Sequence, residues 1–202
     1  MIFKWMVIGC GFQIKGENGR THLFASRKQN NMMYPGWVFY SEIIKASSKN
    51  SEDPYKFEEI VFKKRDAKYF DAKLTHNPAI RKYGCKYIIF LYRKKYPNSI
   101  LTNKFGNIPD EYDSKDPNIG YNKAWNMKRI GIAWSNSAYG LWLRRDKPIL
   151  ETHPDKWVNS ITPNPTPWIM PDCTIYFLYK SSNRKVNRAA SFMLGVAKVD
   201  NY

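Results

Sequence analysis

The side chains of this sequence that could do chemistry gather around a repeated Asn-Pro pair. His76 precedes Asn77-Pro78, and a second pair, Asn164-Pro165, follows 87 residues later. Two carboxylates are candidates for the same region: Asp71, six residues before Asn77, and Glu42, which opens an apolar run. A carboxylate or an imidazole can exchange a proton, whereas an amide can hold a hydroxyl group but cannot take a proton from water.

Each of these residues also has a plain structural explanation. A residue before proline is driven into extended geometry, so Asn77 and Asn164 could serve only to shape the chain. His76 could cap the start of a strand, and Asp71 and Glu42 could be ordinary loop or strand acids. The residue types alone leave both explanations open.

Cofactor and metal chemistry are not indicated. Three cysteines, Cys10, Cys85 and Cys173, stand far apart with no C-x-x-C pair and no neighbouring histidine, so neither a zinc site nor a disulfide framework is expected. Cys85 and Cys173 fall at expected hairpin turns and are predicted to be free thiols. No glycine-rich phosphate loop and no Ser/His/Asp nucleophile pattern is present.

The charge balance is strongly basic. The 202 residues include 33 Lys and Arg against 17 Asp and Glu, a net charge of +16. Such a balance raises nucleic acid or an anionic glycan as a partner. The basic residues form short scattered runs rather than a tail or a helix face, which favours solvated loop charge first, an anionic polysaccharide second and nucleic acid last.

No segment indicates membrane insertion or secretion. No stretch approaches the roughly 18 apolar residues that a membrane helix needs. The first eight residues are too short for a secretory leader and are predicted to form a strand. The compartment stays open, because a secreted protein without its leader would look the same.

The candidate residues must be positioned by a repeated unit. The closing tyrosines Tyr92 and Tyr179, like the two Asn-Pro pairs, are 87 residues apart, and so are Ala46 and Ala133. The shared order is Thr-x-Asn-Pro, a short strand, a tight turn, and an apolar strand ending in Phe-Leu-Tyr. A recurrence at a fixed spacing is the sequence signature of a repeat architecture.

The runs that follow each hairpin complete a four-strand unit. Residues 129–135 and 139–150 supply two further strands after the first hairpin, and residues 42–48 and 54–62 match them earlier in the chain. Residues 192–199 match the third strand again. Four antiparallel strands per unit predict an all-β fold, a β-propeller of the five-bladed type, because a lone blade cannot bury both faces. A β-sandwich would not explain the recurrence.

The repeat predicts one propeller domain or fragment over 1–202. Its parts are a partial blade over 1–64, a complete blade over 70–150 and a nearly complete blade over 157–202. Long loops are expected from Gly11 to Pro35 and from Pro97 to Met127. Three blades do not close a ring, so we expect either a truncated propeller or self-association with another chain.

The strings Thr75–Ile80, Lys86–Tyr92, Arg129–Ser135, Gly140–Arg144 and Asp146–Leu150 are similar to the five-bladed propellers of glycoside hydrolase family 43 and its relatives. The resemblance implies a site at the axial end where the innermost strands begin, with three carboxylates from consecutive blades. An inverting glycosidase needs an acid and a base about 6.5–9.5 Å apart, and a third carboxylate can raise the pKa of the acid.

The sequence departs from that family at the positions where the catalytic carboxylates are expected. The innermost strands begin with Asn77 and Asn164 instead of Asp or Glu, and the strand expected to carry the base would precede Met1. Asp71 and Glu42 remain as the candidate catalytic carboxylates.

The candidate substrate contacts are His76, Asn77, Asn164, Trp37 and Trp134. The tryptophans are candidate platforms under a sugar ring, although core packing is the stronger expectation for Trp134.

Three functions follow from the resemblance and the charge. The first is a carbohydrate-active propeller that cleaves a glycosidic bond of an oligo- or polysaccharide by acid–base chemistry, if the site is intact. The second is a non-catalytic glycan-binding propeller, which the two asparagines favour. The third, a basic nucleic-acid or protein scaffold, rests only on the net charge.

Overall fold

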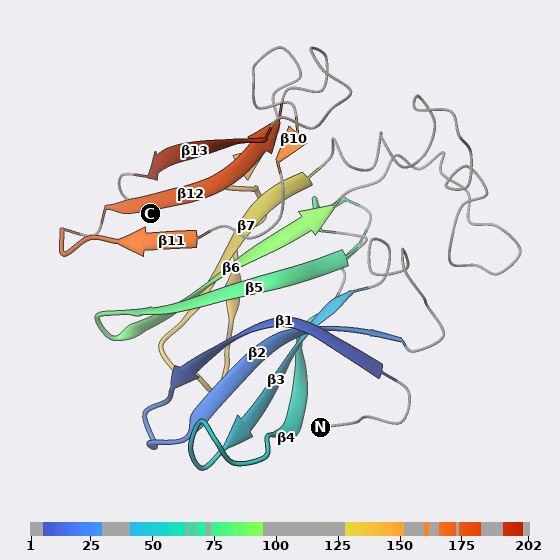
Figure 1. Cartoon of the computed structure of the whole chain (residues 1–202), viewed down its shortest axis with the longest axis vertical. Coiled ribbons are helices and arrows are strands. Elements are labelled where there is room, and N and C mark those ends of the chain that lie inside the picture. The colour runs from blue at the N-terminus through green and yellow to red at the C-terminus, as the bar shows by residue number, and fades with distance from the viewer. Residues whose placement is uncertain are drawn as a thin grey trace, which may run out of the picture.

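The structure is a computed structural model, and its described residues are 6–29, 41–63, 65–66, 68–71, 74–94, 128–151, 160–161, 166–172, 174–182 and 192–199. They form three antiparallel sheets, stacked along the longest axis of the molecule with the N-terminal sheet at one end (Figure 1). Each sheet is called a unit below.

The first unit holds four strands in chain order. They are β1 (Met6–Lys15), β2 (Thr21–Gln29), β3 (Glu42–Ser48) and β4 (Lys56–Phe62). β3 is buried along almost its whole length, whereas β4 is mostly exposed, so β4 is the outer strand.

The second unit repeats this order. It contains β5 (Leu74–Tyr83), β6 (Lys86–Lys94) and β7 (Lys128–Ser135). Two short strands, β8 (Leu143–Arg144) and β9 (Leu150–Glu151), both pair with β7 and share the outer position. The predicted outer strand over 139–150 is therefore present only as two short pieces.

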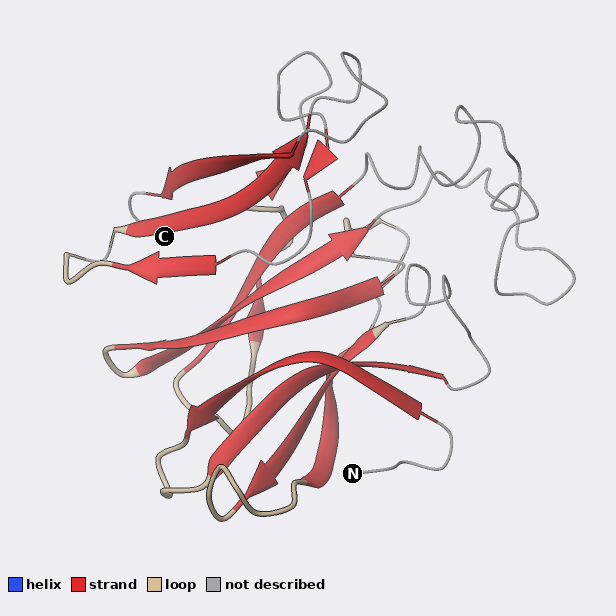
Figure 2. Ribbon diagram, in the orientation of Figure 1, coloured by secondary structure: helices blue, strands red, loops and turns tan. Residues whose placement is uncertain are grey.

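The third unit is built around β12 (Ile175–Ser182). β10 (Ser160–Ile161) and β11 (Thr166–Ile169) pair with β12, and β13 (Phe192–Val199) also pairs with it. Figure 2 shows strands joined by loops and no helix in the part of the chain that is described. The all-β prediction is confirmed, and no helix in the described residues could cross a membrane.

Strand pairing reproduces the recurrence seen in the sequence. Leu74 of β5 pairs with Lys94, and Ile161 of β10, 87 residues after Leu74, pairs with Ser181, 87 residues after Lys94. The pairing of β10 with β12 therefore has the same register as the pairing of β5 with β6 at the end where β5 begins.

Alternation along β6 divides the core into two layers. Tyr87, Ile89 and Leu91 pack toward the first unit, where they meet Phe24, Ile43 and Phe62. The intervening Ile88 and Phe90 pack toward the third unit with Ile175, Phe177 and Tyr179. Both faces of the second unit are covered, as the propeller expectation requires.

The prediction of a long loop from Gly11 to Pro35 is wrong for residues 11–29, the part of it that the structure describes. Residues 11–29 complete β1 and form β2, so the first unit has four strands rather than a partial set. The turn between the strands is tight: the N–H of Gly16 donates to the carbonyl of Arg20 at 2.8 Å, and Gly19 has φ 78°. The loop predicted from Pro97 to Met127 lies outside the described residues.

The third unit packs on the second as one blade of a propeller packs on the next. The rings of Phe90 and Phe177, 87 residues apart in the sequence, pack edge to face with centroids 4.8 Å apart. Phe177 pairs with Pro167 and Ala197, and Ile89 of the second unit pairs with Ile80, the counterpart of Pro167, and with Ala133. The face of the third unit that meets the second therefore corresponds to the face of the second unit that meets the first, as a simple rotation requires. The opposite face of the third unit is exposed, with large apolar side chains at Trp168, Leu178 and Val196.

Candidate functional site

The innermost strands of the first two units carry matching bulges. The pairing of β1 with β2 shifts between Gly9 and Gly11, and the pairing of β5 with β6 shifts between His76 and Ala79. Bulges re-aim side chains and are frequent near functional sites. The bulge in β5 contains Asn77-Pro78, and the bulge in β1 contains Cys10.

Asn77 adopts left-handed backbone geometry, with φ 46°. The prediction that proline would drive it into extended geometry is therefore wrong, because Asn77 lies in the bulge of β5, where the register shifts within a continuous strand. Asparagine tolerates this conformation better than most residues. The buried Asn77 N–H donates to Ser26 Oγ at 2.7 Å, which ties the bulge of the second unit to the first unit.

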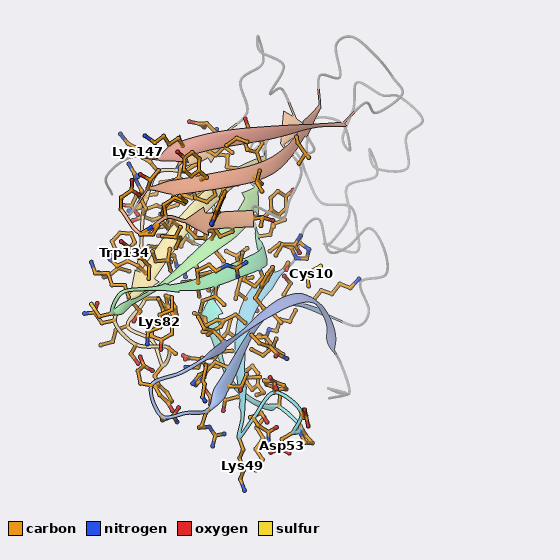
Figure 3. The ribbon with its side chains drawn as sticks, turned by 60° about the vertical axis from the view of Figure 1, so that its left-hand side comes forward. Cys10, Lys49, Asp53, Lys82, Trp134 and Lys147 are labelled. Carbon is orange, nitrogen blue, oxygen red and sulfur yellow. The ribbon has the colours of Figure 1, made fainter. Side chains whose placement is uncertain are left out.

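A hollow of about 190 Å³ lies where the two bulges meet. It is lined by backbone and side chains of both units: Gly9, Cys10, Ser26, Arg27, Lys28, Ser41 and His76. Figure 3 shows the labelled Cys10 on the side of the sheets opposite Trp134. The volume is below the roughly 300–1,000 Å³ of sites for drug-sized ligands, so it suits one small polar group or ring.

Hydrogen bonds fix the polar side chains of this hollow. Ser41 Oγ and His76 Nδ1 are 2.7 Å apart, and the His76 ring lies edge-on to Tyr92. Arg27 holds Glu42 through Nε at 3.2 Å and Nη2 at 2.9 Å. The hydroxyl, imidazole and guanidinium groups are thereby oriented before any ligand arrives.

The lining is basic and contains no carboxylate among the described residues. Arg27 and Lys28 contribute positive charge, and Glu42 is engaged by Arg27 beside the hollow rather than lining it. Hydroxyl and imidazole groups can donate to or accept from a ligand hydroxyl, and a guanidinium can bind a ligand carboxylate. The arrangement offers hydrogen-bond donors and acceptors to a polar ligand.

No protein-family model matches this sequence, and no curated protein matches it. Solved structures do. A family 117 glycoside hydrolase of the marine bacterium Zobellia galactanivorans superposes with a TM-score of 0.67 at 14% identity, over 97% of this chain and 53% of that one. A thermostable family 43 glycoside hydrolase gives 0.60 at 12% identity, over 98% and 55%. The chain has the fold of a glycoside hydrolase β-propeller.

The propeller fold predicted from the repeat is confirmed over part of a ring, because the chain spans about half the length of these structures. A family 43 β-xylosidase/α-arabinofuranosidase from a compost metagenome, solved with xylotriose, gives a TM-score of 0.52 at 13% identity, over 86% of this chain and 42% of that one. The three units are accordingly propeller blades.

Asp71 lies away from the hollow. It is fully buried in the connection between the first two blades, where Arg65 Nε lies 2.8 Å from its carboxylate and Arg144 Nη1 lies at 3.1 Å. Arg144 belongs to β8, in the outer position of its blade. The described residues do not bring Asp71 and Glu42 to one hollow, and their catalytic assignment stays a prediction.

The remaining candidates fall elsewhere. Trp134 lies on β7 and packs against the core between the second and third blades. Trp37 and Asn164 lie outside the described residues. Among the residues that are described, no group of three or more His, Cys, Asp or Glu side chains is placed to hold a metal ion.

Six lining residues were not among the predicted site residues: Gly9, Cys10, Ser26, Arg27, Lys28 and Ser41. The Gly9-Cys10-Gly11 string was the only signal for them, since two glycines around one side chain are compatible with a bulge. The serines carry no distinguishing pattern and meet His76 only through the packing of two blades.

Proposed function

We propose that this chain is a glycan-binding β-propeller whose hollow between the β1 and β5 bulges takes the hydroxyl groups of an oligosaccharide. The observation that carries the proposal is the Ser41–His76 pair, held at 2.7 Å on the surface of this hollow. A ligand hydroxyl can donate to one such group and accept from another. The absence of a lining carboxylate among the described residues favours binding over hydrolysis.

The similarity in fold to glycoside hydrolases supports an oligosaccharide as the ligand. One structure with this fold was solved with xylotriose, an oligosaccharide of neutral sugars. Lys28 adds positive charge to the hollow beyond the Arg27–Glu42 ion pair, which favours a sugar acid over a neutral sugar. We therefore propose an oligosaccharide that carries a carboxylate, and expect trigalacturonic acid to bind more tightly than xylotriose.

Calorimetric titration with these two trisaccharides tests the proposal. His76→Ala is expected to weaken binding at least about tenfold, a loss near 1.4 kcal/mol. Ser51→Ala, in the exposed turn between β3 and β4, is the matched control and should bind like the parent. Equal affinities of the parent and His76→Ala for both sugars would refute this location of the site.

Glycosidic bond cleavage is the second candidate function. Glu42 follows Ser41 directly, and its Arg27 partner lines the hollow, so this carboxylate lies beside the place proposed for the sugar. Hydrolysis of an aryl-glycoside panel that disappears in Glu42→Gln, with glycan binding retained, would support catalysis. Measurable glycan binding by the parent without turnover would refute catalysis and support the binding function.

We also propose that the exposed face of the third blade packs against a second copy of the chain. By strand pairing Leu178 matches Phe90, which the third blade covers completely. Trp168 and Val196 are 62% and 61% exposed on the same side of the sheet. The exposed face of the third blade therefore corresponds to the face through which the second blade packs on the third. Two copies would also hold about as many residues as one of the matched propellers.

Sedimentation velocity tests this association. The parent is expected to form a dimer that Leu178→Ser dissociates, because the substitution removes apolar area from the centre of the face. Leu143→Ser, at an exposed leucine of the second blade, is the control. A parent that sediments as a monomer at high protein concentration and moderate salt would refute the proposal.

A further inference from the structure

A second and larger hollow lies on the outer side of the first two blades. Its volume is about 540 Å³, within the range of sites for small organic ligands. It is lined by β4 and by the segment that leads into β8: Glu59, Val61, Phe62, Ser137, Tyr139, Gly140, Leu141, Trp142 and Arg144. We call it the outer cleft; it shares no lining residue with the hollow at the bulges.

Contacts with the first blade hold the wall of the outer cleft in place. Lys45 Nζ donates to the carbonyl of Tyr139 at 2.7 Å, and the N–H of Ala138 donates to Glu17 Oε1 at 3.0 Å. The Trp142 ring packs edge-on against Phe24 and Phe62. Because both backbone contacts cross between blades, the wall is ordered before any ligand binds.

Leu141 is held in a costly state at the lip of this cleft. Its φ is 57°, in the left-handed region, and its side chain is 97% exposed. Such geometry costs roughly 1–3 kcal/mol in a residue with a bulky side chain. The fold gains almost no buried area from Leu141 in return, so the strain and the exposure together point to contact with a ligand.

The outer cleft contains both hydrogen-bond donors and hydrogen-bond acceptors. Glu59 offers a carboxylate acceptor that Lys45 holds at 2.7 Å, and Ser137 offers a hydroxyl. Tyr139 adds an aromatic ring that is partly exposed. An aromatic or aliphatic surface beside paired donors and acceptors matches a sugar ring, which has one C–H face and a rim of hydroxyl groups.

We propose that the outer cleft is a second glycan site, which binds one sugar ring of an oligosaccharide against Tyr139 and Leu141. The inference rests on the proposed glycan-binding function and extends it to a surface away from the inner strands. A chain with two such sites would hold a polysaccharide at two points, and the second contact would raise the overall affinity without any new residue at the first.

Amide chemical shifts measured with xylotriose, cellotriose and trigalacturonic acid test the outer cleft. At least one sugar is expected to shift the amides of residues 137–144. Leu141→Gly should weaken that binding at least about tenfold without loss of stability, because glycine adopts the same φ without strain. Leu143→Ala, at an exposed leucine that does not line the cleft, should leave it unchanged.

The experiment distinguishes the outer cleft from the hollow at the bulges, because each proposed site can be refuted without the other. His76→Ala should keep the shifts at residues 137–144, because it changes only the hollow at the bulges. Shifts near Ser41 and His76 with none at 137–144 would overturn the outer cleft and leave the proposed function standing. Shifts at 137–144 alone would overturn the hollow at the bulges instead. Binding by Leu141→Gly equal to that of the parent would also overturn the outer cleft.

Discussion

Ser41 Oγ lies 2.7 Å from Nδ1 of His76, and this contact joins the first blade to the inner strand of the second. Ser41 directly precedes β3, and His76 opens the bulge of β5, so the pair depends on the packing of two blades. Ser26 adds a second link through the N–H of Asn77. The hollow is therefore formed by the interface between the blades.

A double-mutant cycle tests whether this pair couples the blades. Ser41→Ala and His76→Ala should each reduce the free energy of unfolding by about 1 kcal/mol, the usual contribution of a hydrogen bond. The double variant should lose less than the two single losses together, because the same bond is removed in each. Urea unfolding measures all four proteins, and strictly additive losses would show that the two side chains do not interact.

His22 predicts a pH dependence of stability. It is fully buried, neither ring nitrogen has a hydrogen-bond partner among the described residues, and burial lowers its pKa below the ordinary value of 6.5. Lys45 and Arg20 lower the pKa further, whereas Glu58 and Glu17 oppose them. As the pH falls below about 6.5 the unfolded chain takes up the proton first, so the free energy of unfolding decreases, by at most about 1.4 kcal/mol per pH unit.

The variant His22→Phe isolates this contribution. It keeps a ring against Tyr139, which His22 meets edge-on at 4.9 Å, but it has no proton to bind. Urea unfolding between pH 7.5 and 5.5 should show a steeper loss of stability for the parent than for the variant. Parallel pH profiles would mean that His22 does not titrate differently in the folded chain.

Asp71 is predicted to stabilise the fold through its ion pairs. Asp71→Asn leaves Arg65 and Arg144 without their buried partner, which costs about 3–5 kcal/mol when one member of a buried pair is removed. Asp146→Asn, which removes the exposed partner of Arg65, should cost less than about 1 kcal/mol. Thermal and urea unfolding compare the two variants. A stable Asp71→Asn protein that has lost glycoside hydrolysis would instead support its catalytic assignment.

Asn77 is predicted to tolerate glycine better than a β-branched residue. Its φ of 46° is accessible to glycine without strain, whereas valine in this region is a severe conformational outlier. Asn77→Val should lose roughly 1–2 kcal/mol more stability than Asn77→Gly. The reverse order of unfolding midpoints would contradict the left-handed bulge.

The repeat could be predicted from the sequence because it is written in local patterns. The 87-residue recurrence links Tyr92 to Tyr179, and the alternation of residues 87–91 separates the two faces of β6. The strand at residues 6–15 was harder to delimit. Gly9 and Gly11 interrupt its apolar alternation, and the predicted long loop misses the tight turn at Gly16–Gly19.

The candidate site was less predictable because its contacts cross between blades. Ser41 and His76 are 35 residues apart, and Arg144 and Asp71 are 73 apart. Nothing in the local sequence pairs Asp71 with two arginines rather than with a substrate. The Asn77-Pro78 pair did indicate the right strand, although its backbone geometry depends on a bulge that the proline rule does not anticipate.

The central claim is that the hollow at the β1 and β5 bulges binds an oligosaccharide. Calorimetric titration of the parent and of His76→Ala with trigalacturonic acid and xylotriose tests it most directly. We expect measurable binding by the parent, tighter for the acidic sugar, and affinity at least about tenfold weaker in His76→Ala. Binding that is absent from the parent, or identical in His76→Ala, would contradict the claim.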